Sequence, residues 1–91
     1  MISIEELNNV TTIIIDVRQP EELIDDPLSN PEITEQPINI PLPELVARLN
    51  ELPTDQRLAF VCAGNIRSVQ AVQYLRARGY DNICVLDKFT L

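Results

Sequence analysis

Residues 57–79, RLAFVCAGNIRSVQAVQYLRARG, contain the clearest structural pattern in this 91-residue chain. The apolar run over residues 57–62 is typical of a buried strand. We expect a helix over residues 68–78, followed by Gly79 as a stop signal. Its apolar residues recur at helical spacing on one face: Val69, Val72 and Leu75. The segment therefore predicts a strand, a short loop beginning at Cys62, and a helix.

Outward from this segment, predicted strands and helices alternate along the chain. A capping box of Ser3 and Glu6 predicts a short helix through Asn9. The other expected elements are strand 11–17, helix 20–24, strand 38–40, amphipathic helix 41–52 and strand 82–86, with an acidic, proline-rich loop over 25–37. This order predicts an α/β fold with a largely parallel central sheet and helices on both faces.

The length and composition predict a single domain over residues 1–91. Hydrophobic residues make up 45% of the chain, which is enough for one modest core. Aromatic residues make up only 4%, so the aliphatic residues must supply most of that core. Disorder of the whole chain is not expected, because disorder accompanies low hydrophobicity.

The charge of the chain bears on its partners. The formal net charge is −7 and the sequence pI is about 4.3. An acidic surface repels phosphate backbones and anionic lipids, so we expect neither nucleic acid nor membrane as a partner. No apolar stretch has the length of a membrane span, and no signal-peptide pattern is present. We therefore expect a cytoplasmic protein.

The chain contains no histidine and two cysteines. The absence of histidine excludes a Cys-His catalytic dyad and any histidine-based metal site. Two cysteines alone cannot complete a structural zinc site, which requires four ligands. The sequence predicts no metal and no cofactor, so any chemistry must proceed without imidazole as the base.

Cys62 is the candidate nucleophile. It ends a predicted strand, and ligands of open α/β sheets bind outside the carboxyl ends of strands. The N–H groups of the loop, the N-terminus of the next helix and the charge of Arg67 would favour the thiolate and lower the Cys62 pKa. The same loop could hold an anionic sulfur group on Cys62.

Other loop residues fit an anion-binding turn. Gly64 and Asn65 tolerate the positive φ that such a turn requires, and Ser68 could cap the helix or donate a hydrogen bond to the loop. The alternative is that Cys62 is an ordinary buried residue before a turn. The concentration of these residue types between Cys62 and Ser68 favours the functional interpretation.

Two further residues are candidates for supporting roles. Asp16 and Arg18 follow a predicted strand and could brace the loop or border the substrate. Alternatively, Asp16 accepts loop N–H bonds while Arg18 pairs with Glu21 or Glu22. Cys84 lies within an apolar strand, which favours a buried core thiol over a cysteine that resolves a Cys62 intermediate.

Taken together, these residues resemble a single rhodanese-like domain, a sulfurtransferase module. The similar segments are Ile15-Asp16-Val17-Arg18, Ile38-Asn39-Ile40-Pro41-Leu42, Cys62 to Ser68, Ala71, Leu75, Gly79-Tyr80 and the strand ending at Leu86. The resemblance implies that Cys62 takes sulfane sulfur from a small donor such as thiosulfate or a persulfide. It further implies that the resulting persulfide passes the sulfur to a thiol or protein acceptor.

The resemblance also implies roles for the loop residues. The outer sulfur would lie among backbone N–H groups, and Arg67 matches the family's loop arginine. The predicted substrate-binding residues are Ala63, Gly64, Asn65, Ile66, Arg67 and Ser68. Four residues separate Cys62 from Arg67, whereas related phosphatases have five, so the short loop favours sulfur over phosphate. Because Ile66 is not basic, we expect modest catalysis on small donors.

The chain departs from the family pattern at three places. Asn65 stands where the family usually has glycine, and Asp87-Lys88 replaces a glycine pair. Glu35-Gln36-Pro37 replaces a Gly-His-Ile segment. These departures leave a second hypothesis open, a non-catalytic binding or regulatory module on the same fold. A phosphatase or arsenate reductase is a third hypothesis, which the loop length disfavours.

Overall fold

A computed structural model describes all 91 residues of the chain. Its centre is a four-stranded, all-parallel sheet in the order β2-β1-β3-β4. The strands are β1 (Thr12–Asp16), β2 (Ile38–Asn39), β3 (Arg57–Val61) and β4 (Ile83–Val85). Because strands and helices alternate, each parallel connection can cross over the sheet. The predicted α/β fold class is confirmed.

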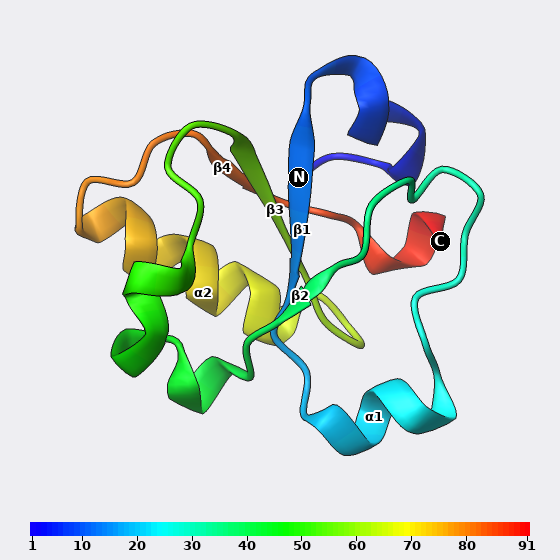
Figure 1. The fold of residues 1–91 in the computed structure, drawn as a ribbon, viewed down its shortest axis with the longest axis horizontal. Coiled ribbons are helices and arrows are strands. Elements are labelled where there is room, and N and C mark those ends of the chain that lie inside the picture. Colours follow the sequence, from blue (N-terminus) through cyan, green and yellow to red (C-terminus); the bar gives the residue numbers. More distant parts are fainter.

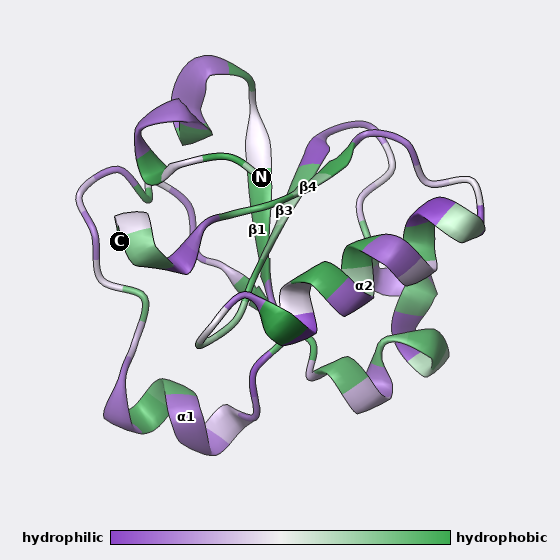
Figure 2. Cartoon of the chain, turned by 180° about the vertical axis from the view of Figure 1, so that it is seen from behind, coloured by the Kyte–Doolittle hydropathy of each residue, from purple (hydrophilic) through white to green (hydrophobic).

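Helical segments cover the sheet on both faces (Figures 1 and 2). The helices are η1 (Ile4–Asn9), α1 (Pro20–Asp25), η2 (Leu42–Glu44), η3 (Val46–Glu51), α2 (Ile66–Ala77) and η4 (Lys88–Thr90), where η denotes a 3₁₀ helix. The larger core lies on the face covered by α2, where Ile15, Phe60 and Leu75 are fully buried. The smaller core on the other face includes Ile4 and Leu7 of η1.

The prediction of one amphipathic helix over residues 41–52 is wrong, because the segment forms two 3₁₀ helices. The segment forms η2 and η3, and Arg48 inside η3 has a non-helical φ of −118°. The apolar residues at helical spacing are Leu42, Leu45, Val46 and Leu49. Leu45 is buried and Leu42 and Leu49 pack half-buried against the core, but Val46 is 57% exposed. Apolar spacing predicts which residues face a core, and it does not distinguish a 3₁₀ helix of three residues per turn from an α-helix.

The end of α2 was predicted correctly from the sequence, and its start was not. The helix begins at Ile66, two residues before the predicted start, so Arg67 and Ser68 lie in its first turn. At the other end, Gly79 has a φ of 95°, and Tyr80 N donates to Leu75 O at 3.0 Å. This pattern is a Schellman cap, which confirms Gly79 as the stop signal.

The two ends of the chain pack together beside β4. Ile2 N donates to Val85 O at 2.8 Å, and Asp87 N donates to Ile2 O at 2.7 Å. The predicted capping box is present, with Ser3 N donating to Glu6 Oε1 at 3.3 Å.

None of the helices has the length and apolar character needed to span a membrane.

Candidate functional site: a cysteine in a cradle of N–H groups

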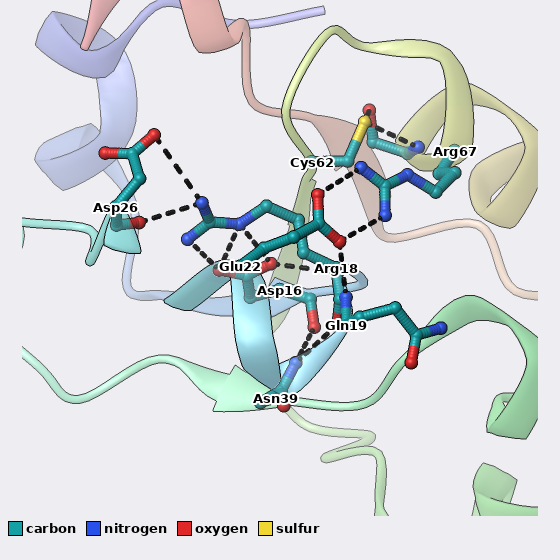
Figure 3. Close-up of polar contacts among 9 residues, drawn as sticks. Asp16, Arg18, Gln19, Glu22, Asp26, Asn39, Cys62 and Arg67 are labelled. Carbon is teal, nitrogen blue, oxygen red and sulfur yellow. Dashed lines mark hydrogen bonds and ion pairs between the residues drawn. The ribbon is translucent and has the colours of Figure 1, made fainter. Parts of the chain in front are cut away.

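Cys62 lies immediately after β3, at the carboxyl edge of the sheet, with 1% of its surface exposed. Its sulfur is 3.3 Å from Ser68 Oγ and accepts a hydrogen bond from Ser68 N at 3.3 Å. The chain reverses between these two residues, so that the first turn of α2 faces the sulfur (Figure 3). The strand and the helix together therefore fix the position of the thiol.

The environment favours the thiolate of Cys62. Burial raises the pKa of the thiol, because it disfavours the charged form. Hydrogen bonds from the Ser68 side chain and from the backbone N–H groups of Ser68, Gly64 and Arg67 lower that pKa. The hydrogen bonds together exceed the effect of burial, and the pKa of Cys62 lies below its ordinary value. A thiolate is the nucleophilic form of cysteine.

Asn65 adopts the left-handed conformation that the sequence predicted for this turn, with φ at 65°. Gly64 does not have a positive φ, so that prediction is wrong for Gly64. One left-handed residue is enough to reverse the chain into α2. Asn65 is also the N-cap residue of α2, which leaves the Ser68 hydroxyl to contact the sulfur.

The remaining loop residues lie at the surface. Ala63 and Gly64 are exposed, and the side chain of Ile66 is 71% exposed. None of the three cavities in the structure is lined by a residue of the Cys62–Ser68 loop. The sulfur site is therefore not a deep pocket. It is a cradle formed by the backbone N–H groups of Gly64, Arg67 and Ser68.

Arg67 forms a two-bond ion pair with Glu22 of α1. Its Nη1 is 2.7 Å from Glu22 Oε2, and its Nη2 is 2.8 Å from Glu22 Oε1 (Figure 3). The Arg67 hydrogen bonds, supported by one from Gln19 N, lower the pKa of Glu22 to about 2. Arg67 is thus paired with Glu22 at the rim, its charge still interacts with that of the Cys62 thiolate, and its backbone N–H is one of the donors that lower the Cys62 pKa.

The pairing of Glu22 with Arg67 was not predicted from the sequence. Glu22 was expected only as a possible partner of Arg18, which is close to it in the chain. The two residues that do pair are 45 positions apart, so local spacing carried no signal for the contact. Their meeting depends on α1 lying beside the carboxyl edge of the sheet (Figure 1).

Asp16 and Arg18 form a buried pair, with exposed fractions of 0% and 1%. Arg18 Nη2 is 2.8 Å from Asp16 Oδ2, and Arg18 Nη1 donates to Asp26 O at 2.8 Å. The suggested pairing of Arg18 with Glu21 or Glu22 is wrong, because its ionic partners are Asp16 and Asp26. Asp16 does accept a loop N–H bond, from Arg18 N at 3.0 Å in the loop that follows β1.

The Asp16–Arg18 pair instead braces the loop and helix that follow β1. Asn39 Nδ2 donates at 2.9 Å to the carbonyl oxygens of both Asp16 and Arg18. Arg18 reaches the last turn of α1 through its bond to Asp26 O. The pair therefore fixes the helix that carries Glu22, and it supports the sulfur site only indirectly.

Cys84 is separate from the sulfur site. It is partly buried in the smaller core, whereas Cys62 belongs to the larger core on the other face of the sheet. Its Sγ lies 3.7 Å from Leu58 O, and burial raises the pKa of its thiol. These features favour a structural thiol over a resolving cysteine, because the sheet lies between the two residues.

Comparison with known proteins shows what the chain is similar to. The family profile described as Rhodanese-like domain matches residues 3–89. A tRNA sulfurtransferase from Histophilus somni is 32% identical over 93 residues, covering 96% of this chain. The match covers 19% of that relative, so the chain spans about a fifth of its length.

Two solved structures share the fold. A rhodanese-related protein from Thermoplasma volcanium is 34% identical, with a TM-score of 0.77 over 94% of this chain and 81% of that one. A NAD-dependent persulfide reductase from A. fulgidus is 33% identical, with a TM-score of 0.67 over 94% of this chain and 14% of that one. The likeness therefore extends to a protein of similar size and to a small part of a larger enzyme.

Proposed function

The chain belongs to the rhodanese-like family, and from that premise we propose that it transfers sulfane sulfur through a persulfide on Cys62. The observation that carries the proposal is the convergence of N–H groups on a buried thiol whose pKa is lowered. The similarity to a relative named as a sulfurtransferase supports the same reaction class.

The proposed reaction has two displacement steps. In the first, the Cys62 thiolate attacks the outer sulfur of a donor R–S–S⁻, and the S–S bond breaks to release RS⁻. The product is a Cys62 persulfide, which carries the negative charge on its outer sulfur. In the second step, an acceptor thiolate attacks that outer sulfur and Cys62 leaves as a thiolate. No net oxidation or reduction occurs, so no cofactor is required.

The cradle is suited to the persulfide as well as to the thiolate. Charge-assisted hydrogen bonds from backbone N–H groups are stronger than those to neutral acceptors. The loop residues Ala63, Gly64, Asn65, Ile66, Arg67 and Ser68 would surround the outer sulfur. The buried Ser68 hydroxyl adds a donor that can follow either sulfur atom, because its proton is free to rotate.

The charges at the rim favour a particular class of donor. Arg67 is paired with Glu22, and the chain as a whole has a net charge of −7. Thiosulfate carries two negative charges, whereas a thiol persulfide exposes one at the reacting group. We therefore propose a low-molecular-weight or protein persulfide as the preferred donor, with thiosulfate as a slower one and a thiol as acceptor.

A non-catalytic binding module is the second candidate. The absence of any cavity lined by the Cys62–Ser68 loop favours it, because enzymes that act on small substrates usually enclose them. The two candidates differ in their dependence on the sulfur atom. A relay loses all transfer when Cys62 becomes serine, whereas a binding module retains its partner.

The decisive experiment measures the intact mass of the protein after exposure to a sulfur donor. The reduced protein is incubated with glutathione persulfide or with thiosulfate, desalted and weighed beside Cys62→Ser. Cys84→Ser is the matched control, since it removes the other thiol. We expect a gain of one sulfur atom in the wild type and in Cys84→Ser that cyanide reverses. No gain with either donor would refute the proposed function.

A further inference from the structure

Asn65 occupies an unusual backbone conformation at the centre of the cradle. It is the only residue other than glycine with a positive φ, at 65°. It separates Gly64, whose N–H lies on one side of the turn, from the N–H groups of Arg67 and Ser68 on the other. A side chain disfavours this conformation, although asparagine adopts it more often than most residues. Relaxation to negative φ would separate the donors that converge on the sulfur.

The segment after β4 engages both ends of the Asn65 side chain. Asn65 Nδ2 donates to Asp87 Oδ1 at 2.9 Å, and Asn65 Oδ1 accepts from Lys88 N at 3.0 Å. The amide also lies 3.6 Å from Met1 Sδ, a weaker contact. Because one bond uses the nitrogen and the other the oxygen, rotation of the amide would break both.

Asp87 is itself fixed by its surroundings. Its backbone N–H donates to Ile2 O at 2.7 Å, and its carbonyl accepts from Thr90 Oγ1 at 2.7 Å. The Oδ1 that binds Asn65 also accepts from Phe89 N at 3.1 Å. Asp87 is thus attached to the edge of the sheet through its backbone and to η4 through its carboxylate, and it can serve as a rigid support.

We propose that Asp87 is a positioning residue for the sulfur site, acting through Asn65. Its carboxylate, together with the Lys88 N–H, stabilises the left-handed turn that directs the N–H groups toward Cys62. Asp87 touches neither the sulfur nor any reacting atom of the proposed reaction. The inference rests on the proposed function only in assuming that the Cys62 thiolate serves sulfur transfer.

The test compares the Cys62 pKa in the full chain and in Asp87→Ala, from the pH dependence of alkylation by iodoacetamide. We expect the pKa to rise by about half a unit to one unit, since the thiolate loses part of its hydrogen bonding. Loss of the Asp87 charge alone would shift the pKa downward, so the sign separates positioning from electrostatics. Asp87→Asn keeps an oxygen acceptor and is expected to show no rise.

Two sets of variants control for a general loosening of the structure. Thr90→Ala removes bonds to Asp87 O and Ile4 N but leaves both Asn65 bonds, so it is expected to lower stability without raising the pKa. Glycine needs no support at positive φ. Asp87→Ala should therefore cause no further rise when it is combined with Asn65→Gly.

A second pair of variants leaves the terminal segment intact. Asn65→Ala should raise the Cys62 pKa, while Asn65→Gly should hold it near the wild-type value. This pair serves if Asp87→Ala does not fold, as judged by circular dichroism. Equal rises in Asn65→Ala and Asn65→Gly would overturn the proposal. An unchanged or lowered pKa in folded Asp87→Ala would also overturn it.

Alkylation does not require sulfur transfer, so the two proposals can fail separately. A pKa rise in Asp87→Ala from a protein that never gains sulfur would support the positioning role and refute the proposed function. Normal persulfide loading with an unchanged pKa in Asp87→Ala would have the opposite meaning.

Discussion

Asp16 and Cys62 lie at the carboxyl ends of neighbouring strands, and they differ in the groups that bind them. Asp16 of β1 is paired in register with Val61, the residue before Cys62. Both Asp16 and Cys62 are buried, and both accept several hydrogen bonds. Asp16, however, accepts hydrogen bonds from a full cation of its own chain, whereas the hydrogen-bond donors to Cys62 are N–H groups and a hydroxyl.

This difference separates a structural site from a reactive one. The carboxylate of Asp16 and the guanidinium of Arg18 satisfy each other, so neither has capacity left for a ligand. The donors around Cys62 converge on a single atom that can change its bonding partner. Partial charges stabilise a thiolate without forming an ion pair that a donor or acceptor would have to displace.

The largest expected effect breaks the structural half of this comparison. Asp16→Ala leaves the Arg18 charge buried without its main partner, and we expect unfolding to become easier by about 3–5 kcal/mol. Urea denaturation followed by circular dichroism measures the change. Asp26→Ala removes an ionic partner that is 65% exposed, and it should cost no more than about 1 kcal/mol. Similar losses in the two variants would contradict the assigned roles.

A double substitution tests whether stability requires the Asp16–Arg18 ion pair itself or only the absence of an unpaired buried charge. Replacing both charges, as in Asp16→Ala with Arg18→Met, removes the unpaired cation that the single variant leaves behind. The double variant should therefore be more stable than Asp16→Ala alone. A further loss of stability would mean that Arg18 matters chiefly through its bond to Asp26 O.

A smaller effect is expected in the reactive half of the comparison. Ser68→Ala removes a side-chain hydrogen bond that lowers the pKa of Cys62, and the pKa should rise by about half a unit to one unit. Below the new pKa the thiolate fraction falls, so alkylation near neutral pH should slow. Ser29→Ala changes an exposed serine and is the matched control. A pKa equal to that of the control would show that the backbone N–H groups suffice.

The sequence predicted most of the fold and part of the site, for identifiable reasons. Apolar periodicity and stop signals are local, and they correctly placed the strands and the end of α2 at Gly79. The 3₁₀ character of η2 and η3 was missed because apolar spacing does not specify the hydrogen-bonding pattern. Local preference also explains why Asn65 was correctly expected at positive φ.

The side-chain pairings of the site could not be predicted in the same way. The bonds from Arg67 to Glu22 and from Asn65 to Asp87 join residues that are far apart in the chain. A spacing argument can show that Arg67 is near Cys62 in sequence, but it cannot show that its guanidinium pairs with Glu22 of α1. Such pairings depend on how α1 and η4 pack at the carboxyl edge of the sheet.

The smallest expected effect would make the reactive site more like the structural one by freeing a cation beside it. Glu22→Gln leaves Arg67 without its ionic partner, so a dianionic donor should be attracted more strongly. We expect persulfide formation from thiosulfate to accelerate about threefold at low ionic strength, and salt should abolish the gain. Glu21→Gln removes one neighbouring negative charge without freeing Arg67, and is the control. An equal acceleration in both variants would mean that net charge governs the rate, and that the Glu22–Arg67 pair has no particular role in donor choice.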